Sequence, residues 1–188
     1  MLLAFNELHL YTGPLSFTLM EFAIFYVLYK NPREFNKSIS HHAAKDVKVY
    51  KVFAVAMSAA LLSLVAYLFL FLIPIVHLSI FIVVLFVVAI ILELLTTWVP
   101  LTDDRKFHPH AILSNTAAFL MPVITIGLLV SGHLKGSALV LAYIGLSIMI
   151  GLVIIFFTVP KARKMYLVYQ SVYIVAFLLT VVLIPFST

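Results

Sequence analysis

Six long apolar segments alternate with short polar stretches along this chain of 188 residues. The segments cover residues 8–30, 49–73, 76–99, 110–132, 136–158 and 164–186, and charged residues or prolines separate them. They are continuously apolar, whereas the strands of a membrane barrel alternate apolar and polar positions. A helix of about 20 to 25 residues rises roughly 30 Å or more, which spans the hydrocarbon core of a bilayer. The pattern therefore predicts an all-α, polytopic integral membrane protein: a single transmembrane domain, residues 1–188, with six helices.

The composition supports this prediction. Hydrophobic residues make up 64% of the chain and charged residues 10%, whereas a soluble domain is about half apolar and a quarter charged. So little polar surface cannot cover a soluble globule, and the remaining apolar surface must face lipid. The chain has no cysteine, which excludes disulfides and cysteine-ligated metals. No basic residue precedes the first apolar run, so we expect this segment to remain as a span.

One proline lies well inside a predicted span. Pro122 is in the middle of the fourth segment, and proline has no amide hydrogen to donate within a helix. We therefore expect a kink near Pro122 and a carbonyl group at Ala118 that lacks its usual helical partner.

Basic residues flank alternate connections. Eleven of the 12 lysines and arginines surround the first, third and fifth connections, and Lys135 alone lies on the other side. The positive-inside rule then predicts a protein of the cell (inner) membrane with these loops in the cytoplasm and both termini outside. We interpret the basic charge as a topology signal and as an attraction for anionic lipid, not as a sign of nucleic-acid binding.

Four polar side chains inside the predicted spans lie about 8 to 14 Å from the cytoplasmic ends, in one layer: Glu21, Glu93, Asn115 and Gln170. A charge at this depth is costly, so these groups are expected to face the bundle interior and to bind a ligand. Four aromatic residues are expected at the mouth of the same pocket: Tyr166, Tyr169, Tyr173 and Trp98. The alternative is that these polar groups only join helices by hydrogen bonds. Small residues at Ala56, Ala60, Ser63, Ser147 and Gly151 are expected at helix contacts.

The third connection contains a group of residues that could bind a metal or act in acid–base chemistry: Asp103, Asp104, His108 and His110. His41 and His42, in another cytoplasmic loop, could add ligands. The alternative is an ordinary solvated loop. Haem is not expected, because the histidines lie at the edges of the spans and not in mid-membrane.

Nothing in the sequence matches a familiar catalytic motif, so no catalytic residue and no cofactor are predicted and a non-enzymatic role is favoured. The leading hypothesis is a protein that binds a lipid or amphipathic small molecule in a polar cavity in the cytoplasmic half of the bundle. A proton-coupled transporter with Glu93 or Glu21 as proton carrier is one alternative. A lipid-modifying enzyme with the Asp/His site is another, and a structural subunit, as a homo-oligomer or with a membrane partner, is a third.

Three stretches carry a resemblance to a known family: SISHHAAKDVKVY, TDDRKFHPHAILSN and KARKMYLVYQSVYIVAF. Together they resemble the bacterial membrane family known as domain of unknown function 998, which is similar in layout to the Frag1, DRAM and Sfk1 group of six-span proteins. The resemblance covers residues 38–186 and implies a six-helix bundle in which an acidic loop leads into a histidine at the head of the fourth span. The first span departs from the family pattern, so the resemblance implies no role for Glu21.

Overall fold

The computed structural model describes residues 9–31, 34–74, 77–99 and 109–182, and every regular element in this part of the chain is a helix. The long helices are α2 (His9–Lys30), α4 (Val47–Tyr67), α5 (Ile80–Trp98), α6 (Pro109–Val130), α7 (Gly136–Thr158) and α8 (Tyr166–Val182). Three short elements join them: α3 (Ile39–Ala44), the π-helical turn η1 (Leu68–Leu72), which continues α4, and the 3₁₀ helix η2 (Pro160–Met165).

Six helices in the described ranges are long and apolar enough to cross a membrane, so the chain is an integral membrane protein. The predicted fifth span, 136–158, has the bounds of α7, and the other observed bounds differ by a few residues. The predicted end of the sixth span, 183–186, lies outside the described residues. The sequence did not predict α3 as an element of its own.

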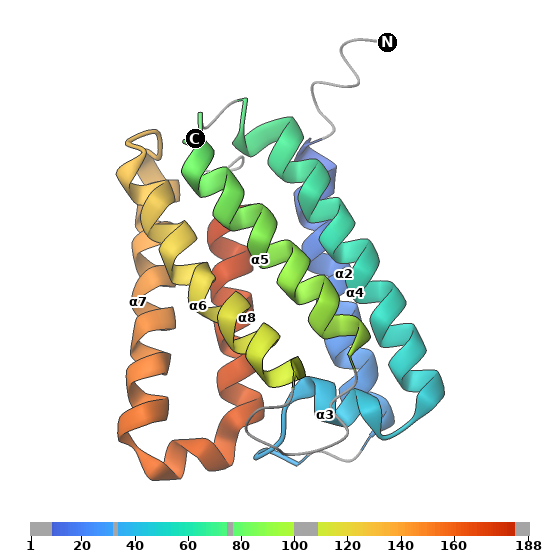
Figure 1. The fold of residues 1–188 in the computed structure, drawn as a ribbon. Helices are drawn as coiled ribbons and strands as arrows, with labels where there is room; N and C mark the ends of the chain where they lie inside the picture. The colour runs from blue at the N-terminus through green and yellow to red at the C-terminus, as the bar shows by residue number, and fades with distance from the viewer. Residues whose placement is uncertain (1–8, 32–33, 75–76, 100–108, 183–188) are drawn as a thin grey trace.

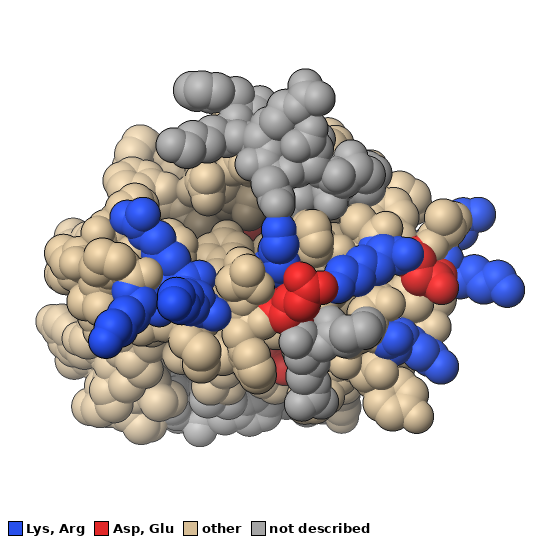
Figure 2. Space-filling view, turned by 90° about the horizontal axis from the view of Figure 1, so that it is seen from below, with Lys and Arg blue, Asp and Glu red and all other residues tan. Residues whose placement is uncertain are grey.

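The long helices form one bundle, and α3 lies across one end of it (Figure 1). Contacts are most extensive between α2 and α4, between α5 and α6, and between α7 and α8. The start of α2 and the end of α8 lie at the end opposite α3 (Figure 1). We call the end that holds α3, η2 and the start of α6 the basic end, because lysine and arginine side chains gather on it (Figure 2).

The small residues of α4 lie at contacts inside the bundle. Ala56 and Ala60 of α4 are buried, and the Ser63 hydroxyl donates a hydrogen bond to the carbonyl of Thr12 in α2 over 2.7 Å. This confirms the predicted helix contact at these three residues.

The predicted contact at Ser147 and Gly151 of α7 is wrong. Ser147 is exposed, and a Cβ atom added at Gly151 would meet no atom within 4 Å. The buried residues of α7 follow a different stripe: Ala138, Ala142, Gly145 and Met149. Their spacing of three and four residues keeps them on one helical face, and Ser147 and Gly151 lie off that face. Residue size alone did not reveal which face turns inward.

Pro122 lies inside α6, as the sequence indicated. The Ala118 carbonyl, which loses its helical donor there, accepts a hydrogen bond from the Tyr173 hydroxyl of α8 over 2.7 Å. The backbone group that the proline leaves open is therefore satisfied by a neighbouring span, as the interior of a membrane protein requires.

Candidate functional site at the basic end

The segment from Glu34 to Asp46 folds over the basic end of the bundle through two helix caps. The Ser38 hydroxyl accepts a hydrogen bond from the amide of His41 over 3.1 Å and caps α3. The Asp46 carboxylate accepts bonds from the amides of Lys48 and Val49 over 2.7 and 3.1 Å and caps α4. Serine and aspartate are preferred at this position because their oxygens satisfy amides that have no partner within the helix.

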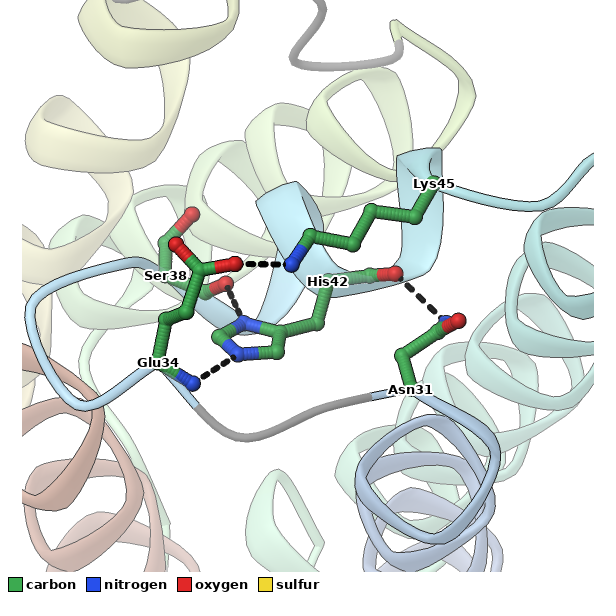
Figure 3. A network of polar contacts seen from close by, with 5 residues as sticks. All are labelled: Asn31, Glu34, Ser38, His42 and Lys45. Carbon is green, nitrogen blue, oxygen red and sulfur yellow. Dashed lines mark hydrogen bonds and ion pairs between the residues drawn. The ribbon is translucent and has the colours of Figure 1, made fainter.

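His42 is fully buried and ties this segment together (Figure 3). Its Nε2 accepts a hydrogen bond from the amide of Glu34 over 2.9 Å, and its Nδ1 donates to the carbonyl of Ser38 over 2.8 Å. The side-chain amide of Asn31 donates to the carbonyl of His42 over 2.7 Å. Because one ring nitrogen accepts and the other donates, this geometry requires a neutral imidazole with its proton on Nδ1.

An ion pair lies on the outside of the same network. The Lys45 ammonium donates to the Glu34 carboxylate (Figure 3). This hydrogen bond and the charge of Lys45 hold the pKa of the Glu34 carboxyl below its usual value. Both side chains are in contact with solvent, so the pair contributes little to stability.

α8 holds the segment from the other side. The Gln170 side-chain oxygen accepts a hydrogen bond from the amide of Ile39 over 3.0 Å, and the carbonyl of Phe35 accepts one from the amide of Leu167 over 2.9 Å. Gln170 therefore positions α3. Because its oxygen takes this bond, its NH₂ group is the part left to donate elsewhere.

Between α3, α6 and α8 lies a cavity of about 170 Å³, which we call the larger cavity. Nine of its ten described lining residues have a polar side chain, which is unusual in so apolar a chain. The lining residues are Asn36, Lys37, Ser38, His41, His110, Ala111, Ser114, Asn115, Tyr166 and Gln170.

A second cavity of about 40 Å³, the smaller cavity, shares Ser114 and Gln170 with the larger one, so the two adjoin. Its polar wall includes the Glu93 carboxylate and the hydroxyls of Thr96 and Thr97 of α5. Both threonine hydroxyls donate to carbonyls of their own helix, at Leu92 and Glu93, over 2.8 Å. The rest of the wall is Ser40 and apolar side chains: Ile24, Ile39, Phe53, Met57 and Ile174.

The structure brings three members of the predicted polar layer together. Glu93 and Gln170 line the smaller cavity, and Asn115 and Gln170 line the larger one. Glu21 lines neither, although its Oε1 atom is buried without a hydrogen-bond partner among the described residues. The layer was placed by depth along each helix, and depth does not specify which way each helix is rotated.

Only one of the four aromatic residues predicted at the mouth of the pocket lines a cavity. Tyr166 lines the larger cavity, but Trp98, Tyr169 and Tyr173 line neither cavity. Trp98 is half exposed and its indole N–H donates to the Ser58 hydroxyl over 3.1 Å. Tyr169 packs on Phe156, and the Tyr173 hydroxyl is bonded to Ala118.

Of the predicted metal or acid–base group, Asp103, Asp104 and His108 lie outside the described residues. His110 is buried, and its Nδ1 donates to the carbonyl of Val99 at the end of α5 over 2.5 Å. His110 and His41 line the larger cavity, whereas His42 does not and instead bonds the amide of Glu34 within the Glu34–Asp46 segment. Within the described ranges, no three histidine or acidic residues are grouped closely enough to hold a metal ion.

Sequence reasoning missed Asn36, Lys37 and Ser38 as cavity residues. The sequence did contain a signal for α3: Ser38 and Asp46 are both residues that favour the start of a helix. Two such residues only eight positions apart indicate a short helix that ends before the next one begins. A short helix between two spans can cover a bundle end, which places its residues over the interior.

No family model, curated protein or solved structure matches this chain. The resemblance to the domain-of-unknown-function 998 family therefore stays a prediction. The geometry of the two cavities is the basis for a functional proposal.

Proposed function

We propose that this membrane protein binds a lipid or another amphipathic small molecule, with the polar head of the ligand in the larger cavity. One observation carries the proposal: polar side chains from α3, α6 and α8 surround a space of about 170 Å³ at the end of an otherwise apolar bundle. Sites for drug-sized ligands span about 300 to 1,000 Å³. The cavity therefore suits a head group, with the hydrocarbon part outside along the apolar helix surfaces.

The basic end is proposed to face the cytoplasm. Exposed lysine and arginine residues of α4 and η2 lie there, including Lys48, Lys51, Lys161 and Arg163. Positive loops stay on the cytoplasmic side during insertion, and they attract the anionic head groups of the inner leaflet. The cavity would then open to that leaflet.

Blocking the cavity tests this function. Ser114 borders both cavities, so Ser114→Trp fills the space, whereas Thr116→Trp adds the same side chain at an exposed position of α6. We expect the wild type and Thr116→Trp to retain lipid through purification in a maltoside detergent, and Ser114→Trp to retain several-fold less by mass spectrometry. Equal retention by the two tryptophan variants, with equal elution from a sizing column, contradicts the proposal.

A further inference from the structure

The two adjoining cavities differ in their ionisable lining residues. The larger cavity has the Lys37 ammonium and the imidazole of His41 in its wall and no carboxylate among its described lining residues. The smaller cavity has the Glu93 carboxylate and no lysine, arginine or histidine among its described lining residues. A ligand that extends through both therefore meets a lysine and histidines first and a carboxylate beyond them.

Hydrogen-bond roles strengthen this difference. The hydroxyl hydrogens of Thr96 and Thr97 are used on helix carbonyls, so these oxygens can only accept. With Glu93 they form a set of acceptors, which suits a group rich in N–H donors. In the larger cavity Lys37 can only donate, and the oxygen of Ser38 accepts from the His41 amide, so its hydroxyl hydrogen is left to donate.

Size adds a second restriction. The smaller cavity, about 40 Å³, has less than a quarter of the volume of the larger one, about 170 Å³. The smaller cavity therefore suits an ammonium group better than a bulkier trimethylammonium group. The larger cavity, about 170 Å³, has room for a phosphate and its ester linkage.

We propose that the two cavities form one site for a head group that carries a phosphate and a primary amine, as phosphoethanolamine does. The phosphate lies in the larger cavity near Lys37 and His41, and the ammonium lies in the smaller cavity beside Glu93. Gln170, shared by both walls, donates its NH₂ group to the phosphate side while its oxygen holds α3. This inference rests on the proposed function and names the ligand class of the same site.

The wild-type protein in maltoside detergent provides the first test. Native mass spectrometry would compare phosphatidylethanolamine, phosphatidylcholine, phosphatidylglycerol and diacylglycerol at equal concentrations. We expect phosphatidylethanolamine to bind about tenfold more tightly than phosphatidylcholine, because the added methyl groups remove the N–H donors that Glu93 would accept. We expect diacylglycerol, which has no phosphate, to bind most weakly.

Two substitutions separate the two ends of the site. Glu93→Gln should remove the preference for phosphatidylethanolamine over phosphatidylcholine, and Lys37→Gln should weaken the binding of both lipids by about tenfold. Glu34→Gln and Lys45→Gln make the same charge changes at the same end of the bundle, but Glu34 and Lys45 line neither cavity. These two control variants should therefore keep the wild-type affinity for each lipid.

Equal binding of phosphatidylethanolamine and phosphatidylcholine by the wild type overturns the inference, and this result does not depend on whether any variant folds. A folded Glu93→Gln protein that still prefers phosphatidylethanolamine also overturns it. Binding of lipid without this preference leaves the proposed function standing, whereas no binding of any lipid overturns both. A separate experiment measures the binding of soluble phosphoethanolamine by thermal shift. If it binds as tightly as the lipid, the ligand of the site is a soluble molecule; if it binds more weakly, the ligand is a lipid.

Discussion

At the scale of single residues, tyrosine hydroxyls satisfy backbone carbonyls of other spans. Tyr50 donates to Thr97, Tyr67 to Val181 and Tyr173 to Ala118, over 2.7 to 3.0 Å. An unsatisfied backbone group in a bilayer costs several kcal/mol, because no water is present to replace the missing partner. Tyr173 is the most informative of the three, since Pro122 explains why its acceptor lacks a helical donor.

Tyr173→Phe is expected to lower the free energy of unfolding by about 1 to 3 kcal/mol, because it leaves the Ala118 carbonyl without a donor. In a Pro122→Ala background the amide of residue 122 can bond that carbonyl, so the same substitution should have a smaller effect. Unfolding of the four proteins in mixed micelles measures this coupling. An equal effect in both backgrounds would show that Tyr173 does not compensate for the proline.

At the scale of elements, close helix crossings depend on one small residue at the right angular position. A Cβ atom at Gly145 of α7 would overlap the Thr180 hydroxyl of α8 and lie 3.1 Å from the Ala176 carbonyl. Gly151 is six residues further along α7, on another face, and a Cβ atom there would meet open space. The same amino acid is therefore required at one position of α7 and free at the other.

Gly145→Ala is expected to destabilise the bundle by about 1 to 3 kcal/mol through overpacking. Gly151→Ala, the matched control, should be neutral or stabilise by up to about 1 kcal/mol, because alanine is the better helix former. The two variants are compared by their thermal unfolding in the same detergent. A Gly145→Ala protein as stable as Gly151→Ala would mean that α7 and α8 do not cross at this residue.

At the scale of the whole molecule, lysine and arginine side chains gather at one end of the bundle (Figure 2). α3 and η2 cover the basic end, and α7, which Lys135 directly precedes, begins at the opposite end (Figure 1). The proposed cavity is at the basic end, so its access depends on which side of the membrane this end faces. Orientation therefore decides which leaflet can supply a ligand.

The absence of cysteine makes orientation simple to measure. Lys135→Cys and Lys161→Cys place single thiols at exposed positions at opposite ends of the bundle. With the basic end in the cytoplasm, a membrane-impermeant maleimide should label Lys135→Cys in intact cells and Lys161→Cys only after permeabilisation. The reverse result would place the cavity on the outer side.

The sequence by itself determined the six spans, because the length of an uninterrupted apolar run is set by the thickness of the bilayer. It also determined the Ala118 carbonyl as a group in need of a partner, because the missing amide of Pro122 is a covalent property of the chain. Both are local facts, readable from consecutive residues.

Only the tertiary structure decided which polar groups meet. Helices that are apolar on all sides give no signal of their rotation, so depth alone could not show that Glu93 lines a cavity and Glu21 does not. The placement of Lys37 and His41 depends on α3, which a hydrogen bond between Ile39 and Gln170 holds across 131 positions of sequence. Such a contact follows from how the packed helices fold back on one another, which no run of neighbouring residues encodes.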